Sequence, residues 1–329
     1  MSTLLGLGVS LGLVVWMYFA IEWGEVGTQL ANSHYWLLIP VSFVMIGHYI
    51  LRALRWRYLL PHTERVPLRV LFDGIMVGNF ANYILPLRAG EFIRPFILSR
   101  ESSHSFSTGL VSVVIERFFD LATVLLSFAV MVFFIPEVPP IVQQGASALT
   151  VVAGALLVFM LVGTLMPKTA ERWIDFGIDF LPAKFRPGIK KFCHDFIEGA
   201  AVLGEKGRIW KVLALTAAVW LSSYLIMYLY LFVYAAPDHP AAHSLWLALA
   251  LGVVVALAVA APSAPGFIGV YQAGCIASFA LFGISKEAGA AFAILTHVYQ
   301  YLFFCLYGIY YLLHGNVSLA DLRGAAARS

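Results

Sequence analysis

The stretch Leu85-Pro86-Leu87-Arg88-Ala89-Gly90-Glu91-Phe92-Ile93-Arg94-Pro95 holds three charged residues beside prolines and a glycine, which interrupt helices. Charged side chains at membrane depth are costly and usually mark the path of a substrate or an ion. Irregular backbone persists in a bilayer only where protein or water covers it. In a chain that spans a membrane, this stretch is therefore the first candidate for a functional site.

The rest of the chain has the composition of an integral membrane protein. Of its 329 residues, 61% are hydrophobic and only 12% are charged, whereas a soluble domain has roughly 25% charged residues. The net charge of +3 reflects basic loops and does not indicate nucleic-acid binding. The three cysteines are far apart, so they predict neither a disulfide framework nor a zinc site.

Apolar segments of about 20 residues predict membrane-spanning helices. The clear segments are 4–21, 35–58, 109–135, 146–166, 209–235 and 289–314. Two further apolar regions, 68–100 and 245–284, are interrupted by Pro, Gly and polar residues, and predict broken or re-entrant helical hairpins. The predicted fold class is an all-α polytopic helix bundle that forms a single membrane domain over residues 1–329.

The positions of Lys and Arg predict the orientation, because cytoplasmic loops hold the excess of these residues. Segment 52–69 has five arginines and loop 167–208 has eight basic residues. Three other loops have no Lys or Arg: 22–34, 136–145 and 236–243. Both termini and loop 167–208 are therefore expected in the cytoplasm, and the base-free loops outside, in a multi-pass protein of the plasma membrane.

Within loop 167–208, apolar residues between Ile189 and Leu203 recur at helical spacing. This pattern favours a helix that lies in the cytoplasmic membrane interface. A connector helix packed on the bundle is the alternative.

Two Pro-x-x-x-Gly motifs indicate an internal repeat. They begin at Pro86 and Pro262, 176 residues apart (262 − 86). The same shift carries segments 35–58 and 109–135 onto the spans in the second half. Since spans 35–58 and 209–235 cross the membrane in opposite directions, repeat one (about 35–135) and repeat two (about 209–314) are expected to be inverted. Inverted repeats with discontinuous helices are typical of transporters.

The first half carries most of the polar residues that could bind a substrate. A helix that starts near Gly90 would present free N–H groups, which form an anion site. Arg88 would add a planar guanidinium suited to phosphate. Arg94 lies one turn beyond Glu91, so these two side chains can pair; interfacial anchoring is the alternative role of the charges. The residues of this candidate site are Asn79, Asn82, Arg88, Glu91 and Arg94.

Glu116, Arg117 and Asp120 form a second charged group, inside the apolar segment 109–135. Residues three and four apart share one face of a helix. The group could balance the arginines of the first stretch, or form a structural ion network without contact to a substrate.

The second half offers Gly266, Gln272 and His297 as candidate site residues. Gln272 lies in the second interrupted region and His297 in the span after it, so we expect the two side chains to be polar partners. A lone histidine in a membrane span is more often a helix-to-helix hydrogen bond than a proton carrier.

The enzyme motifs HExxH, CxxC, Walker A and DDxxD are absent from this sequence. The sequence therefore predicts no catalytic residue, no metal and no cofactor, and a protein that is not an enzyme.

The sequence resembles the lysylphosphatidylglycerol synthase transmembrane-region family over roughly residues 5–315. The resemblance rests on motifs in a fixed order: Asn79, Pro86 to Glu91, Arg94, the group Glu116-Arg117…Asp120 and the run Pro265 to Val270. The resemblance implies movement of a lipid with a polar, phosphate-bearing head group between leaflets. The family's synthases add a cytoplasmic aminoacyl-transferase domain, which this sequence does not show, so synthesis of lysyl-lipid is not expected. Gln272 stands where the family's second-half motif usually has an acid, and His297 where it has a base.

The expected function is therefore transport (flipping) of a phosphate-bearing polar lipid between leaflets. Arg88 and Arg94 would hold the phosphate, and Glu91, Glu116 and Asp120 would balance them or bind a cationic group. The alternatives are a secondary transporter of a small organic anion, an intramembrane lipid-modifying enzyme and an accessory subunit. The expected partner is a membrane lipid with an anionic head group, and no nucleic acid; the lipid, the direction, the energy source and homo-oligomer formation stay open.

Overall fold

A computed structural model of the chain describes residues 2–61, 66–85, 88–134, most of 150–178, positions 186 and 190, 202–235, 237–261, 263–315 and four positions beyond (317, 318, 321 and 324). Every regular element in these residues is a helix, which confirms the all-α prediction. Loop 136–145, most of the expected interfacial helix at 189–203 and part of the expected span 146–166 lie outside the described residues.

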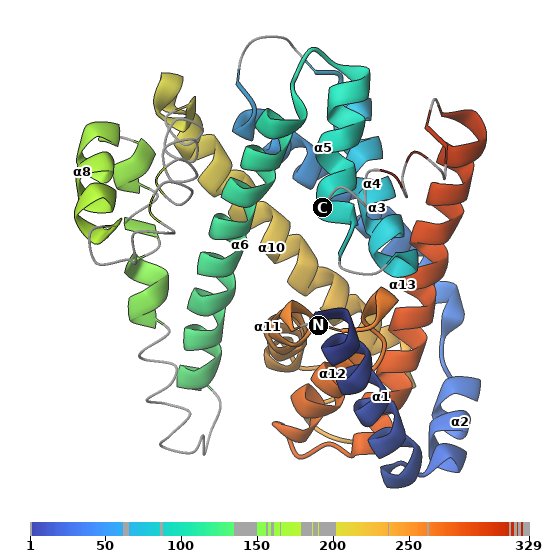
Figure 1. Cartoon of the computed structure of the whole chain (residues 1–329). Coiled ribbons are helices and arrows are strands. Elements are labelled where there is room, and N and C mark those ends of the chain that lie inside the picture. Colours follow the sequence, from blue (N-terminus) through green and yellow to red (C-terminus); the bar gives the residue numbers. More distant parts are fainter. Residues whose placement is uncertain are drawn as a thin grey trace.

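The described helices form the bundle in Figure 1. In chain order they are α1 (Ser2–Ala20), α2 (Trp23–Ala31), η1 (Tyr35–Leu37), α3 (Leu38–Leu59), α4 (Leu68–Ile84), α5 (Gly90–Glu101), α6 (Phe106–Phe134), α8 (Pro167–Ile178), η2 (Val202–Gly207), α10 (Arg208–Val233), α11 (Leu245–Ala260), η3 (Pro265–Phe267), α12 (Val270–Ala280) and α13 (Lys286–His314).

Three of these segments are long and apolar enough to cross a membrane alone: residues 35–59, 208–233 and 286–314. Helices α1 and α2 pass the same test only as a pair, with a bend of 90° between them. Large apolar side chains lie on the outer surface, for example Phe19, Phe43, Leu221 and Leu306. Hydrocarbon stabilises such a surface, whereas water does not.

Each interrupted region forms a helical hairpin, as the sequence predicts. In the first hairpin, α4 ends at extended backbone on Leu85 and α5 begins at Gly90. The two helices touch at a pair of glycines: a Cβ atom on Gly90 would lie only 1.9 Å from the carbonyl oxygen of Gly78. In the second hairpin, α11 packs against α12, where Gly274 faces Val255 and Ala258. The prolines of the two motifs, Pro86 and Pro262, lie outside the described residues.

The hairpins are held between long helices. Helix α3 packs on α10, α4 packs on α13, and α11 packs on α6. Figure 1 shows the chain descending along α6 and ascending along α13, so these two helices run in opposite directions.

The tips of the two hairpins meet inside the bundle. The Tyr83 ring, near the end of α4, lies edge-on to Phe267 with 6.1 Å between ring centroids. Arg88 Nη2 donates to the carbonyl oxygen of Ala261 at 3.4 Å. Helix α1 supports the second tip, because Ser10 Oγ accepts a hydrogen bond from the backbone N–H of Ala264 at 2.8 Å. Of the candidate residues, Arg88 therefore lies against the tip of the second hairpin.

Candidate functional site

A single carboxylate, Glu116 on α6, is surrounded by arginines from two other helices. Arg94 of α5 binds it through both terminal nitrogens, Nη2 to Oε2 at 2.7 Å and Nη1 to Oε1 at 3.3 Å. Arg55 and Arg52 of α3 contact Oε1 at 3.0 and 3.2 Å. Glu116 and Arg55 are fully buried. A two-pronged, charge-assisted contact of this kind is among the strongest hydrogen bonds in proteins.

The ion network continues one turn along α6. Asp120 accepts hydrogen bonds from both terminal nitrogens of Arg55, at 2.7 and 3.2 Å, and from Trp220 Nε1 at 3.2 Å. Arg117 links Asp120, at 3.7 Å, to Glu91 of α5, at 3.2 Å. The network therefore ties the first hairpin to α3 and α6.

The network carries more positive than negative charge. Its members are Arg52, Arg55, Arg94 and Arg117 against Glu91, Glu116 and Asp120. Among the described residues one net positive charge is left, because arginine stays protonated in proteins. Arg88 at the hairpin tip adds another. Among the described residues it forms no ion pair, and its guanidinium lies 5.8 Å from the centre of the Phe267 ring.

The expected pairing of Glu91 with Arg94 is wrong. Glu91 pairs with Arg117, and Arg94 points inward to Glu116 while its guanidinium stacks 4.5 Å above the ring of the buried Trp56. The interior of the bundle offers Arg94 a carboxylate and an aromatic face together, so these contacts replace the local pair on the helix surface.

Arg52 and Arg55 were not among the predicted site residues. Their positions predicted a basic cytoplasmic segment, although they lie inside α3 and face the carboxylates of α6. A usable signal was present: two arginines three residues apart in one apolar span, and two acids four apart in another.

The predicted anion site at the start of α5 is wrong as well. The helix begins at Gly90 as expected, but its first N–H groups already have acceptors. Gly90 N donates to Asn82 Oδ1 at 2.8 Å, and the next two N–H groups donate to the carbonyls of Arg88 and Ala89 at 3.0 Å each. Asn82 therefore caps the helix. The Asn79 amide donates to Ile75 O in its own helix, at 2.9 Å, which does not place it in the charged cluster.

The predicted pair in the second half is confirmed. Gln272 Nε2 lies 2.9 Å from His297 Nδ1, and His297 Nε2 lies 2.7 Å from the carbonyl oxygen of Gly266. The carbonyl can only accept, so His297 is a neutral imidazole that donates from Nε2 and accepts from the Gln272 amide at Nδ1. Gln272 Oε1 in turn accepts from the backbone N–H of Gly269 at 2.8 Å. Gly266 and Gly269 both have positive φ, 69° and 87°, which glycine adopts without strain.

Comparison with known proteins identifies the family of the chain. Residues 3–308 match the family model described as the lysylphosphatidylglycerol synthase TM region. The chain belongs to this family. The resemblance to the lysylphosphatidylglycerol synthase transmembrane-region family is thus confirmed. Together with this family, the apolar helices indicate a multi-pass membrane protein.

One curated relative of this family member is named Glycosyltransferase AglD, from Haloferax volcanii. It is 23% identical over 334 residues, which cover 92% of this chain and 53% of the relative. The chain therefore spans about half the length of that protein. No solved structure gives a significant match. Among the described residues of this family member, no group of His, Cys, Asp and Glu side chains is placed to hold a metal ion.

Replacing His297 by leucine is expected to destabilise this family member by about 1–3 kcal/mol, the cost of leaving a buried carbonyl, here Gly266 O, without a donor. Leucine keeps most of the volume, so a cavity contributes little. Thermal unfolding of the purified protein in detergent measures the effect. The matched control is His34→Leu, at an exposed side chain; equal unfolding temperatures for the two variants would contradict the hydrogen bonds assigned to His297.

Proposed function

We propose that this protein transports (flips) a phosphate-bearing polar lipid between the leaflets of the membrane, and that it is not an enzyme. The observation that carries the proposal is the excess of positive charge on the first hairpin and its ion network, which includes Arg88 at the contact between the hairpin tips. Uncompensated charge inside a membrane protein usually serves a substrate or an ion. A phosphate would supply the missing negative charge.

We infer an inverted repeat, which supports this transport function. Adding 176 to the bounds of α4 gives 244–260, against 245–260 for α11, and adding it to those of α6 gives 282–310, against 286–314 for α13. The packing of α4 on α13 corresponds to that of α11 on α6. We infer that the two hairpins are re-entrant and enter from opposite sides, with their tips near the midplane, as in other transporters with discontinuous helices.

The same proposal places the protein in the plasma membrane with both termini in the cytoplasm. The warrant is the absence of Lys and Arg from loops 22–34, 136–145 and 236–243.

Within the site, Arg88 is the residue proposed to hold the phosphate. Arg94 uses both terminal nitrogens on Glu116, so it supports the site and has no terminal nitrogen left over. Arg88 is half-buried and lies at the contact between the tips. Within the described part of the chain it donates only to a carbonyl oxygen at 3.4 Å, a long bond that a phosphate could replace. Its backbone has φ of 54°, a strained conformation for a residue with a side chain, of the kind that clusters at functional sites.

Arg88→Ala is expected to reduce transport roughly ten- to a hundredfold, because a charge-assisted contact contributes ~1.5–3 kcal/mol. Arg88→Lys keeps the charge without the planar fork and should fall between alanine and wild type. Both variants share the backbone strain, so their difference isolates the side chain. The measurement is movement of fluorescent anionic lipid across reconstituted vesicles. The control is Arg100→Ala, at an exposed arginine 3.6 Å from Asp321.

Wild-type transport by well-folded Arg88→Ala would remove this residue from the mechanism. Transport of small organic anions but not of lipid would favour the secondary transporter. Because a relative is named as a glycosyltransferase, the molecular mass of the lipid recovered from the vesicles should also be measured by mass spectrometry. A changed lipid mass would favour a lipid-modifying enzyme over a flippase.

A further inference from the structure

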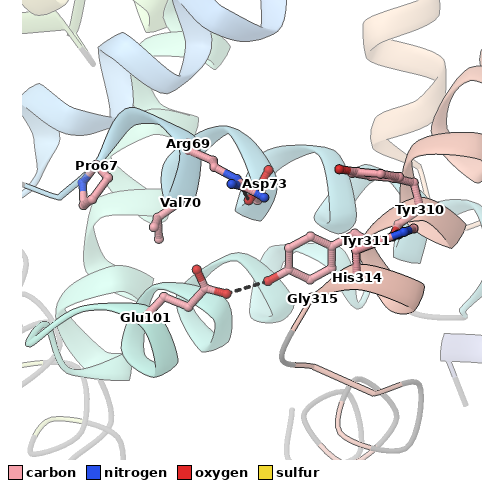
Figure 2. Close-up of a pocket in the computed structure, with 9 residues that line it drawn as sticks. All are labelled: Pro67, Arg69, Val70, Asp73, Glu101, Tyr310, Tyr311, His314 and Gly315. Atoms are coloured by element: carbon pink, nitrogen blue, oxygen red, sulfur yellow. Dashed lines mark hydrogen bonds and ion pairs between the residues drawn. The ribbon is translucent and has the colours of Figure 1, made fainter.

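A pocket lies away from the hairpin tips, at the opposite ends of the first hairpin's helices. Its volume is about 360 Å³, within the range of roughly 300–1,000 Å³ that is usual for ligand sites. The start of α4, the end of α5 and the end of α13 enclose it (Figure 2). The lining residues that matter here are Arg69, Asp73, Glu101, Tyr310, Tyr311 and His314.

Helix ends of opposite polarity meet at this pocket. Pro67 occupies the position just before α4, and Gly315 follows the end of α13; both residues line the pocket. The start of a helix favours negative charge and its end favours positive charge. A ligand that carries both signs close together would be stabilised by both ends.

The charged side chains that line the pocket also carry both signs. Arg69 projects from the first turn of α4 with 81% of its side chain exposed, and its Nε lies 3.6 Å from Asp73 Oδ2. Asp73 is nearly buried and accepts a hydrogen bond from the Tyr307 hydroxyl. Glu101 accepts one from the Tyr311 hydroxyl at 2.8 Å, the contact drawn in Figure 2. The three charges, one positive and two negative, leave an acidic excess.

Both carboxylates keep capacity for a further donor. A carboxylate has about four lone-pair sites, and the tyrosines occupy one on each. Tyr310, whose ring stacks on His314 at 4.7 Å between centroids, adds an aromatic face in the pocket lining. Aromatic faces attract ammonium groups.

We propose that this pocket binds a zwitterionic phosphate–ammonium group, with the phosphate at Arg69 and the start of α4, and the ammonium between Asp73 and Glu101. The zwitterionic head group of a membrane lipid and free phosphoethanolamine share this chemistry. The assignment does not depend on the lipid-flipping proposal, because the pocket and the Arg88 region share no residue.

Binding of phosphatidylethanolamine to the purified full chain, followed by native mass spectrometry in mild detergent, tests the assignment. Glu101→Gln and Arg69→Ala should each weaken binding about tenfold or more. Glutamine can still accept the Tyr311 hydrogen bond, and Arg69 is mostly exposed, so both variants should fold. The matched control is Glu25→Gln, at an exposed carboxylate of α2 that contacts Gln29.

Competition with soluble phosphoethanolamine distinguishes a lipid ligand from a soluble one. If phosphoethanolamine displaces the lipid, the pocket recognises the head group alone. If phosphatidylethanolamine stays bound, the lipid is the ligand. Either result supports the site provided that Glu101→Gln lowers the affinity. Equal binding of phosphatidylglycerol, which lacks the ammonium, would overturn the proposal. So would binding that is lost in Arg88→Ala but kept in Glu101→Gln, because the lipid would then occupy the hairpin tips.

Discussion

A Glu116→Gln variant is expected to lose about 3–5 kcal/mol of stability, the usual cost of breaking a buried ion pair by removing one partner. Glutamine has almost the same shape, so packing changes little. The charge it removes is the one shared by Arg52, Arg55 and Arg94, at distances of 2.7–3.2 Å. Their positive charges would then repel one another in the interior of the bundle.

Unfolding temperature and the recovery of monodisperse protein after mild heating both report this loss. Glu25→Gln serves again as the control, since it removes the same charge from an exposed position and is expected to change stability by less than about 0.5 kcal/mol. A Glu116→Gln protein as stable as this control would show that the ion network is not formed.

Gly90→Ala is expected to force the first hairpin open. Its new Cβ would lie 1.9 Å from Gly78 O and 2.7 Å from Asn82 Oδ1, the atom that caps the helix. Both the backbone and the cap must move, so the cost should reach or exceed the ~1–3 kcal/mol of ordinary overpacking. Because Arg88 precedes Gly90 by two residues, we expect transport to fall together with stability.

The control for this variant is Gly12→Ala, in the middle of α1, where an added Cβ meets no atom within 4 Å. Alanine favours helix over glycine by about 1 kcal/mol, so this variant should be as stable as wild type or more stable. If Gly90→Ala behaves like Gly12→Ala, the close packing of α4 on α5 is refuted.

The sequence was sufficient to locate the features that local chemistry dictates. Proline and glycine at the two motifs predicted both helical hairpins, because proline lacks an N–H donor and glycine permits turn conformations wherever they occur. The shift of 176 residues predicted the Gln272–His297 pair, because repeated elements place equivalent helices side by side. The family was predicted for a similar reason, from motifs whose order and spacing are specific.

The ion network was predicted only in part: the sequence offered Glu116 as a counter-charge for Arg94, but its contacts with α3 join helices that are distant in the chain. Arg55 and Glu116 are 61 residues apart (116 − 55), and nothing local to either residue selects the other. Local reasoning instead paired Glu91 with Arg94 and counted Arg52 and Arg55 as loop charges. The anion site failed because Asn82, eight residues before Gly90, reaches back across the hairpin to cap it.

The two hairpins are fastened by bonds of very different strength. The first is anchored to α3 and α6 by ions, and pulling it away would separate opposite charges in an apolar medium, at a cost of several kcal/mol. The second is held to α13 by neutral hydrogen bonds at Gln272, His297 and Gly266, each contributing only about 1 kcal/mol. If the protein alternates between inward-open and outward-open shapes, the first hairpin is the fixed frame and the second is the moving gate.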